Sequence, residues 1–383
     1  MEITKKFFIN LFILSILLFF GFNCSSSKYG ITLDSLDENQ QLVYVKDGNK
    51  LMRIDAGGKN PEDLIKIGAR IMAPVWSPDG SKVAFFSYGK KMGSFNLSNP
   101  FPASNQNVKL IIFDFKDYSH RELGSFNLLA KKFVRGQDKE LVVIPPQWSA
   151  NGDQVFVIDS GGIHVVDAKT GKERSVALGN LSDVIILEKS MIYTDGKNLM
   201  LYDIVNKAKI DLLEKSSSLR ANFFENIKLL AASHDNELLA IAEGNKIVIL
   251  DFLTMKADRL WETEQPIYWM EWMPGERKLL FLSGEPDESN RSRDTGSTSV
   301  PESGSYEFYF SAPIEKQVNK IYGCTKLDVR KATPSISPNG KHASIVFKKS
   351  NKKEQVHIID LNNFQEIQLT RKGRCSWAVF RPN

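Results

Sequence analysis

Aspartate residues recur at the ends of short apolar runs in this sequence, and carboxylates are the groups that acid–base catalysis or cation binding would need. The runs read Leu51-Met-Arg-Ile-Asp55, Leu110-Ile-Ile-Phe-Asp114, Ile163-His-Val-Val-Asp167, Leu199-Met-Leu-Tyr-Asp203, Ile247-Val-Ile-Leu-Asp251 and Val356-His-Ile-Ile-Asp360. A degenerate copy is Phe308-Tyr-Phe-Ser-Ala312. One carboxylate per copy, always at the same place, predicts hydrogen bonds within local turns rather than a convergent cluster.

The other reactive side chains form no catalytic or metal-binding set in the sequence. The five His residues are dispersed, and His164 and His357 occupy the same place in two of the runs, which predicts packing or surface positions rather than metal ligands. The Gly-x-Ser-x-Gly pattern of a hydrolase nucleophile does not occur. We therefore expect a protein that is not an enzyme, with no catalytic residues, no metal and no cofactor.

The apolar runs belong to a repeated antiparallel meander. Each follows another β-rich run, such as Gln154-Val-Phe-Val-Ile158, and pairs such as Asp47-Gly48 between the two runs supply the positive φ angles of tight hairpins. A polar turn and a short further run follow each closing aspartate. With one preceding strand, the repeat therefore predicts a four-stranded unit.

The strand that precedes each set ends in a turn motif. It reads Ala73-Pro-Val-Trp-Ser-Pro-Asp-Gly80, Pro146-Gln-Trp-Ser-Ala-Asn-Gly152 and Thr333-Pro-Ser-Ile-Ser-Pro-Asn-Gly340. Pro sets φ for the second turn position, Asp or Asn suits the third and Gly the fourth, so we expect a corner between first and second strands. The residues assigned to this structural motif are Trp76, Ser77, Pro78, Asp79, Gly80, Trp148, Pro338 and Gly340. The two tryptophans are expected to pack between neighbouring units.

These motifs resemble the TolB-like family of WD-repeat-related β-propellers over essentially all of the chain after about residue 38. The resemblance implies an all-β fold, a single propeller of seven four-stranded blades, with six as the alternative if residues 181–218 form no complete sheet. The segment 375–383 matches a first strand, so the C-terminal strand should pair with the N-terminal strands and close the ring. The family's separate amino-terminal α/β domain is not expected, so no partner of that domain is implied.

The first 24 residues have the pattern of an export signal. Lys5 and Lys6 precede an apolar run from residue 7 to 22, which is shorter than a comfortable membrane span. Gly21-Phe22-Asn23-Cys24 resembles a bacterial lipoprotein signal of the looser spirochaete type, in which the cysteine is acylated. We expect a signal peptide at 1–23, acylated Cys24 with a tether at 24–38, and a propeller at 39–383. An uncleaved signal anchor is the alternative.

Two long loops, 89–107 and 285–305, interrupt second-to-third-strand hairpins. Because strands alternate in direction, both loops should decorate one face of the ring. Long loops in compact folds often carry function. The candidate binding residues are Phe95, Phe101 and Pro102 in the first loop and Arg291 and Arg293 in the second. Export also leaves open a disulfide between Cys324 and Cys375.

The composition excludes several classes of protein. With 42% apolar residues, 25% charged residues and a formal net charge of +5, the chain is neither disordered nor collagen-like, and it carries no basic stripe for nucleic acid. The sequence favours a non-enzymatic scaffold, lipid-anchored through Cys24, most simply at the outer membrane. Its partner is expected to be another envelope protein, or a peptide or glycan. The alternatives are a propeller lyase or hydrolase that uses channel residues, and a surface-exposed adhesin. Oligomeric state is left open.

Overall fold

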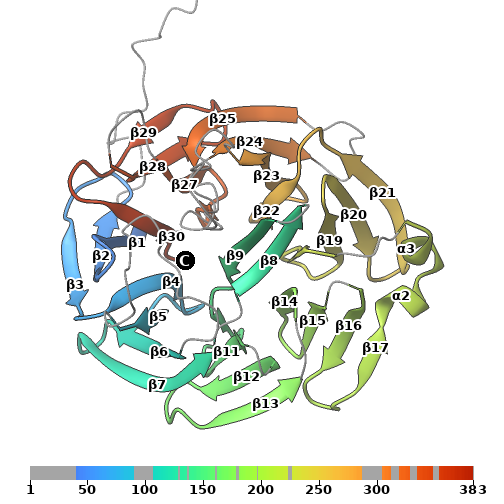
Figure 1. Cartoon of the computed structure of the whole chain (residues 1–383), viewed down its shortest axis with the longest axis horizontal. Coiled ribbons are helices and arrows are strands. Elements are labelled where there is room, and N and C mark those ends of the chain that lie inside the picture. Colours follow the sequence, from blue (N-terminus) through green and yellow to red (C-terminus); the bar gives the residue numbers. More distant parts are fainter. Residues whose placement is uncertain are drawn as a thin grey trace, which may run out of the picture.

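The computed structural model describes residues 40–89, 107–127, 130–135, 138–159, 162–177, 181–195, 197–222, 227–286, 304–311, 319–327, 334–347 and 353–382. The strands in these ranges form antiparallel sheets arranged as a ring, with the C-terminus near its centre (Figure 1). No helix in these ranges combines the length and the apolar character needed to cross a membrane. The all-β propeller predicted from the repeat is confirmed.

Five of the sheets are four-stranded meanders, each running outward from an inner strand near the axis (Figure 1). The first two consist of β30 (Cys375–Phe380), β1 (Gln41–Lys46), β2 (Lys50–Asp55) and β3 (Glu62–Lys66), and of β4 (Arg70–Trp76), β5 (Lys82–Tyr88), β6 (Asn107–Asp114) and β7 (Ser119–Asn127). The third consists of β10 (Gln147–Trp148), β11 (Gln154–Asp159), β12 (Gly162–Asp167) and β13 (Glu173–Ala177). The fourth consists of β14 (Asp183–Ile186), β15 (Ser190–Thr194), β16 (Leu199–Asp203) and β17 (Lys209–Asp211). The fifth consists of β18 (Leu229–Ala232), β19 (Leu238–Glu243), β20 (Lys246–Asp251) and β21 (Lys256–Glu262).

The sixth sheet has eight strands and corrects the expectation of seven separate blades. Its two meanders are β22 (Ile267–Trp272), β23 (Leu279–Pro286), β24 (Gly304–Ser311) and β25 (Asn319–Leu327), and β26 (Ser335–Ile336), β27 (His342–Phe347), β28 (Gln355–Asp360) and β29 (Glu366–Gln368). A single pair, Leu327 with Phe347, joins β25 to β27 and merges the two meanders into one sheet. The ring therefore has six sheets. The reason differs from the one anticipated, because residues 181–218 do contain a complete sheet, β14–β17.

The C-terminal strand closes the ring as predicted. Strand β30 pairs antiparallel with β1, with Leu42 opposite Phe380 and Lys46 opposite Cys375. Just beyond the strand, the Arg381 backbone N–H donates to the Gln41 carbonyl at 2.7 Å. One sheet is thus built from both ends of the propeller, and β1 is not left as a free edge.

Four elements were not predicted from the sequence. Strands β8 (Ala130–Arg135) and β9 (Asp138–Val143) form a separate hairpin, which Figure 1 draws within the ring. Helices α2 (Leu212–Lys215) and α3 (Ser217–Asn222) lie at the outer edge between β17 and β21 (Figure 1). Helix α2 begins where the Asp211 carboxylate accepts the Leu213 and Glu214 backbone N–H groups, an N-cap.

The core lies between neighbouring sheets. Central strands such as β5 are buried on both faces, because each sheet packs against one neighbour on either side. Accordingly Val83, Ala84, Phe85 and Phe86 are all fully buried. This explains why the strands read as nearly continuous apolar runs rather than as an alternation of apolar and polar residues.

Tryptophans at the ends of inner strands form hydrogen bonds to the preceding sheet, which we call seam bonds. The indole Nε1–H of Trp76 donates to Val379 O at 3.1 Å, that of Trp148 to Val75 O at 3.3 Å, and that of Trp272 to Ala231 O at 2.9 Å. In all three bonds the acceptor is the carbonyl of the second-to-last residue of the neighbouring inner strand. The last residue of that strand occupies the position equivalent to tryptophan. Trp76 and Trp148 therefore pack between sheets, as predicted.

Where the inner strand does not end in tryptophan, its backbone forms the seam bond instead. The Ile186 N–H donates to Gln147 Oε1 at 3.2 Å and the Phe380 N–H to Ser335 Oγ at 3.2 Å. The Ile336 N–H donates in the same register to the Glu271 carboxyl group. At the seam between β14 and β18 the bond lies two residues earlier in each strand, where the Leu230 N–H donates to Asp183 Oδ2 at 2.9 Å. Each seam between inner strands thus has a polar link suited to the residues present.

The corner motif is held by its own side chains. Ser77 Oγ donates to Asp79 Oδ1 at 2.6 Å and accepts the Lys82 N–H at 2.9 Å. The Ser81 hydroxyl and N–H both donate to the Asp79 carboxylate. The same serine-centred arrangement recurs at Ser149, Ser233 and Ser337. In the structure this motif forms the corner between first and second strands.

Glycine ends this corner for two reasons. Gly80 has a φ of +63° and Gly340 a φ of +69°, which favour glycine. In addition, a Cβ at Gly80 would lie 2.6 Å from Arg381 Nε, on the segment that follows the closing strand. Pro338 precedes Asn339 in the second of these corners, as Pro78 precedes Asp79 in the first.

We predict that Trp76→Phe lowers the free energy of unfolding by about 1–3 kcal/mol, because it leaves the Val379 carbonyl without its indole donor. Urea denaturation measures this change. Trp377→Phe is the matched control: Trp377 is similarly buried, and the described part of the chain gives its indole no hydrogen bond. Equal losses in the two variants would assign the effect to lost volume rather than to the seam bond.

We also predict that Asp79 makes the fold sensitive to acid. Burial by itself would raise the pKa of Asp79, but hydrogen bonds from Ser77 and Ser81 lower it from 3.8 to about 2. The stability that this carboxylate contributes is therefore present above pH 3.8 and is lost as the pH falls towards about 2.

Asp79→Asn should remove this part of the acid sensitivity while staying folded at pH 7, since Asn151 and Asn339 occupy the same place in two other corners. Tryptophan fluorescence during acid titration measures it. Glu276→Gln, at an exposed ion pair with Lys278, should titrate like the wild type. An Asp79→Asn protein with the wild-type acid transition would contradict the prediction.

Candidate functional site

An open groove of about 890 Å³ crosses three successive sheets, those of β4–β7, β10–β13 and β14–β17. Its walls are the β6–β7, β10–β11, β12–β13 and β14–β15 turns. These first-to-second and third-to-fourth-strand turns all leave from one side of the ring, which we call the turn face. Since strand direction alternates, the end of β5, the start of β6, the end of β23 and the start of β24 lie on the opposite face.

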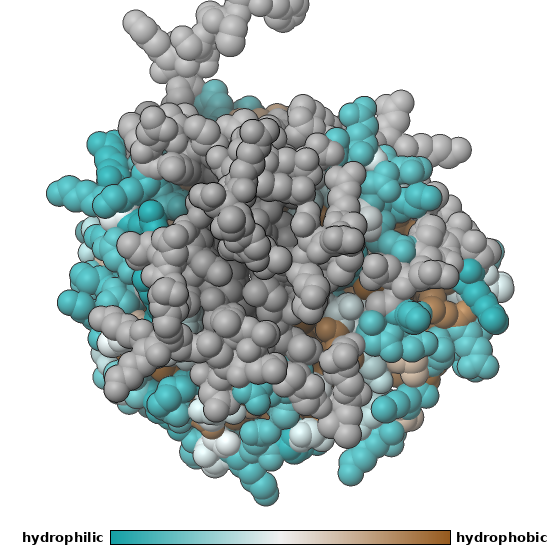
Figure 2. All heavy atoms as spheres, viewed as in Figure 1, coloured by the Kyte–Doolittle hydropathy of each residue, from teal (hydrophilic) through white to brown (hydrophobic). Residues whose placement is uncertain are grey.

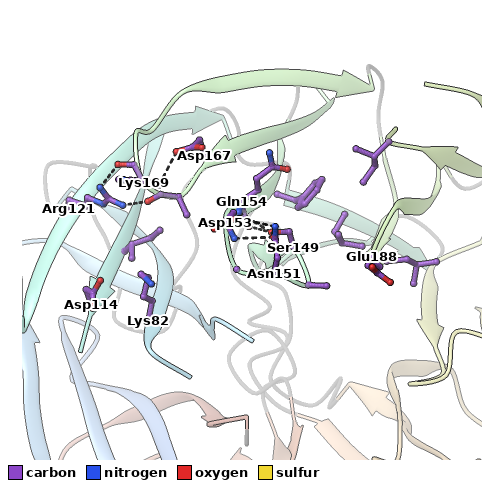
Figure 3. Close-up of a pocket in the computed structure, with 18 of the residues that line it drawn as sticks. Lys82, Asp114, Arg121, Ser149, Asn151, Asp153, Gln154, Asp167, Lys169 and Glu188 are labelled. Carbon is purple, nitrogen blue, oxygen red and sulfur yellow. Dashed lines mark hydrogen bonds between the residues drawn. The ribbon is translucent and has the colours of Figure 1, made fainter. Parts of the chain in front are cut away.

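One end of the groove is built by an arginine that links two sheets. Arg121, on β7, donates from its guanidinium group to the carbonyl oxygens of Ala168 and Lys169 in the β12–β13 turn. Figure 3 shows this side chain reaching across to that turn, with Asp167 beside it. Asp167 accepts the Lys169 N–H at 3.0 Å and the Thr170 N–H at 2.7 Å. The backbone of this turn is therefore held from both sides.

The middle of the groove is a corner motif. Ser149 Oγ donates to Asn151 Oδ1 at 2.7 Å, and Asn151 Nδ2 donates to Asp153 Oδ2 at 2.9 Å. Figure 3 shows this network in the centre, with Glu188 of the β14–β15 turn on the far side. The corner predicted as structural thus also lines a cavity.

The closing aspartates act locally, as predicted. Asp203, Asp251 and Asp360 each accept backbone N–H groups two and three residues further along. In the groove, hydrogen bonds from Thr170 hold the pKa of Asp167 below its ordinary value, and hydrogen bonds from Ser119 do the same for Asp117. Both carboxylates are therefore ionised at neutral pH, so they suit hydrogen-bond acceptance rather than proton donation.

Exposed large apolar side chains lie in or beside turns of the turn face. Among the described residues, the large hydrophobic side chains that are exposed are Tyr118 at 52%, Val205 at 68%, Ile210 at 37% and Leu253 at 76%. Three of them lie in third-to-fourth-strand turns, and Ile210 follows such a turn on β17. Tyr118 and Val205 directly follow groove residues Asp117 and Ile204. The coloured surface of the view in Figure 2 is mostly hydrophilic, with small hydrophobic areas.

Several residues selected from the sequence lie outside the described part of the chain. These are Cys24, Phe95, Phe101, Pro102, Arg291 and Arg293. Binding by these loops therefore stays a prediction.

The structure contradicts the possible disulfide between Cys324 and Cys375. Cys375 is a buried free thiol on inner strand β30, 3.4 Å from Thr370 Oγ1. Cys324 lies on β25, the outermost strand of its meander, opposite Tyr306. An inner strand and an outer strand of different sheets hold the two residues. Burial also raises the pKa of the Cys375 thiol to about 11, so it is not a reactive thiolate.

The two histidines in register bind carboxylates across strands. His164 lies 2.7 Å from Asp159 Oδ1 and 2.7 Å from Glu173 Oε1, and His357 Nδ1 lies 2.6 Å from Glu366 Oε1. Both side chains are largely buried, in agreement with packing positions. The described ranges hold no group of three His, Cys, Asp or Glu residues suited to a metal ion.

Two kinds of important residue were missed in the sequence. The apolar residue two places after a closing aspartate, as at Val205 and Leu253, was an available signal for the exposed surface. The polar residue just before the tryptophan position, as at Gln147 and Glu271, was the signal for seam bonds. Arg121 had no such signal, because its partners are backbone carbonyls of another sheet.

Comparison with known proteins gives partial matches. No protein-family model matches the chain. The Tol-Pal system protein TolB of Ruthia magnifica subsp. Calyptogena magnifica is 24% identical over 120 residues, which is 25% of this chain and 28% of the relative. The Tol-Pal system protein TolB of Methylobacillus flagellatus is 41% identical over 54 residues, 13% of this chain and 12% of the relative. The chain thus matches less than a third of the length of these relatives.

Solved structures with the same fold include proteins of different activities. TolB from Acinetobacter baumannii matches with a TM-score of 0.50 and 17% identity, covering 91% of this chain and 68% of that one. An oligogalacturonate lyase in complex with manganese matches with a TM-score of 0.51 and 10% identity, covering 88% and 86%. Identities this low support the fold alone. The chain is therefore a β-propeller whose sequence is similar to TolB proteins over part of its length.

Proposed function

We propose that this protein is a non-enzymatic scaffold of the bacterial cell envelope that docks an extended segment of another envelope protein on its turn face. Residues 1–23 would export it, and a lipid on Cys24 would hold it on the outer membrane through the tether at 24–38. The names of the curated relatives, which place them in the Tol-Pal system, support an envelope role.

The observation that carries this proposal is the coincidence of groove and apolar surface. The exposed large hydrophobic side chains of the described residues all lie on or beside turns of the same face that holds the groove. Exposed apolar side chains beside a polar groove would give an extended partner apolar contacts as well as hydrogen bonds. The groove supplies turn-bound carboxylates and the Lys82, Lys169 and Lys189 side chains as polar partners.

The position of residue 40 indicates which face of the ring would lie towards the membrane. The Gln40 carbonyl accepts the Ala56 N–H at 2.8 Å beside the β2–β3 turn, so residue 40 lies on the turn face. A tether of residues 24–38 would leave from there and reach at most about 50 Å when extended. A partner docked on the turn face would accordingly lie on the membrane side of the ring.

Site-specific photo-crosslinking in cells tests the docking face. A photoreactive amino acid at Val205, which is 68% exposed, should give a crosslinked protein partner. The matched control is the same amino acid at Lys197, which is exposed in the β15–β16 hairpin of the same sheet but on the opposite face. Tyr118→Ser with Leu253→Ser should weaken the Val205 crosslink, since both remove apolar contact area.

Removal of residues 90–106 should leave the Val205 crosslink unchanged. A crosslink found at Lys197 but not at Val205, or one abolished by that deletion, would assign docking to the opposite face and overturn the proposal. A purified protein that cleaves a sugar or lactone substrate would instead support the enzyme alternative.

Labelling with a fatty-acid probe tests the anchor. Wild type and Cys375→Ala should both incorporate the label, because Cys375 is buried and its thiol is un-ionised at neutral pH. Cys24→Ala should incorporate none and should move to the soluble fraction. A Cys24→Ala protein that still takes up the label would exclude the lipoprotein assignment.

A further inference from the structure

An arginine and a tyrosine meet on the turn face, across the seam between the first two sheets. Arg53 lies near the end of β2, and its guanidinium Nη2 donates to the hydroxyl oxygen of Tyr118, in the β6–β7 turn, at 3.3 Å. The same nitrogen donates to Glu62, the partner of Arg53 in register on β3. Because Tyr118 directly follows the groove residue Asp117, this contact lies beside one end of the groove.

Aromatic rings hold the arginine and the tyrosine in place. The Arg53 guanidinium carbon lies 5.4 Å from the centre of the Phe115 ring, within the range of a cation–π interaction. The Phe115 ring stacks on Trp76 at 5.0 Å and meets the Tyr118 ring in a T-shaped contact at 6.3 Å. Trp76 is itself fixed by its seam bond. A partner would therefore meet side chains that are already ordered, which lowers the entropic cost of binding.

Part of the Arg53 guanidinium group is available to a partner. Both of its hydrogen bonds use Nη2, and its Nε and Nη1 groups have no acceptor among the residues that the structure describes. Neither of these two atoms is fully buried. The nearby carboxylates are bound within their own turns, since Asp55 accepts a side-chain amide at 2.8 Å and Asp117 a backbone N–H at 3.1 Å. The free N–H donors of Arg53 are thus left for an acceptor from outside.

Another arginine of the turn face shows the same group fully occupied. Arg277 donates through Nε and Nη2 to the Asp235 carboxylate and through Nη2 to that of Glu237, so one guanidinium binds two carboxylates. Arg53 has the carboxylate of Glu62 alone. A second carboxylate would complete the arrangement, and hydrogen bonds between a guanidinium and a carboxylate are among the stronger ones in proteins.

We propose that Arg53 binds an acidic side chain of the segment that docks on the turn face. This contact rests on the proposed function, because it belongs to the same docked partner. The carboxylate of the partner would accept from the free Nε and Nη1 groups of Arg53, and a neighbouring apolar group would lie against Tyr118, which is 52% exposed. Arginine and tyrosine are the residue types that contribute most to binding at protein interfaces.

Capture of the partner in cells tests this contact. With the photoreactive amino acid at Val205, Arg53→Gln should lower the yield of captured protein about tenfold, as expected for the loss of a charge-assisted hydrogen bond. Glu62→Gln should capture at least as much as the wild type, because it keeps the arginine and releases Nη2. If the ion pair served only to hold β2 and β3 together, both variants would lower the yield equally.

Two further variants control for folding and for charge. The double variant Arg53→Gln with Glu62→Gln leaves no carboxylate without its partner, so it replaces Arg53→Gln if that protein folds poorly, and it should lose capture to the same extent. Lys50→Gln is the matched control. Lys50 is a cation at the other end of β2, paired with Asp63 on β3 at 2.9 Å, and this variant should capture like the wild type.

The captured partner then locates the acidic residue. Each Asp and Glu of its docked segment is replaced in turn by Asn or Gln. One of these changes should lower capture by the wild type about tenfold and leave capture by Arg53→Gln unchanged, which is direct coupling between the two side chains.

The contact is excluded, and docking at Val205 stands, if the Arg53 variants capture like the wild type or if no acidic residue of the partner couples to Arg53. A wild-type protein that captures no protein at Val205, or captures lipid there instead, would overturn the docking proposal and this contact with it.

Discussion

The hydrogen bond between adjacent inner strands is the contact on which this ring depends. The sheets narrow towards the axis, and buried polar groups there must find partners within the protein. The ring uses two solutions. Where the inner strand ends in tryptophan, the indole donates to a backbone carbonyl of the preceding sheet, as Trp76 does to Val379. Where it ends in an aliphatic residue or phenylalanine, its backbone N–H donates to a polar side chain, as Ile186 does to Gln147. The polar side chain is thus needed where the indole is missing.

The turn face is distinguished by hydrogen bonds within its turns. The serine-centred corners and the closing aspartates use their polar groups to hold turns, so the turn face is built from rigid backbone. Rigid turns can present exposed apolar side chains such as Val205 and Leu253 at little entropic cost. A groove formed by such turns is suited to binding. Hydrogen bonds lower the pKa of Asp117 and Asp167 in this groove, so these two carboxylates are not suited to donating protons.

The seam bonds use acceptor side chains of different chemistry. Gln147, Ser335 and Glu271 perform one structural task, yet only the glutamate changes charge with pH. The enclosure that makes a seam bond strong also makes an ionised group there unfavourable. The β22–β25 and β26–β29 meanders meet near the axis at the Glu271 seam, and the single bridge between β25 and β27 joins them further out.

The local pattern of residues determined the strands, the Ser77–Gly80 corner, the turn role of the closing aspartates and the pairing of β30 with β1, because each depends on near neighbours or on a repeated register. Only the tertiary structure decided the rest. The bridge between Leu327 and Phe347 joins strands from separate repeats, and Cys375 and Cys324 are kept apart as members of an inner and an outer strand. The partners of Arg121 and Glu271 are backbone groups of neighbouring sheets, which carry no side-chain identity for a sequence pattern to reveal.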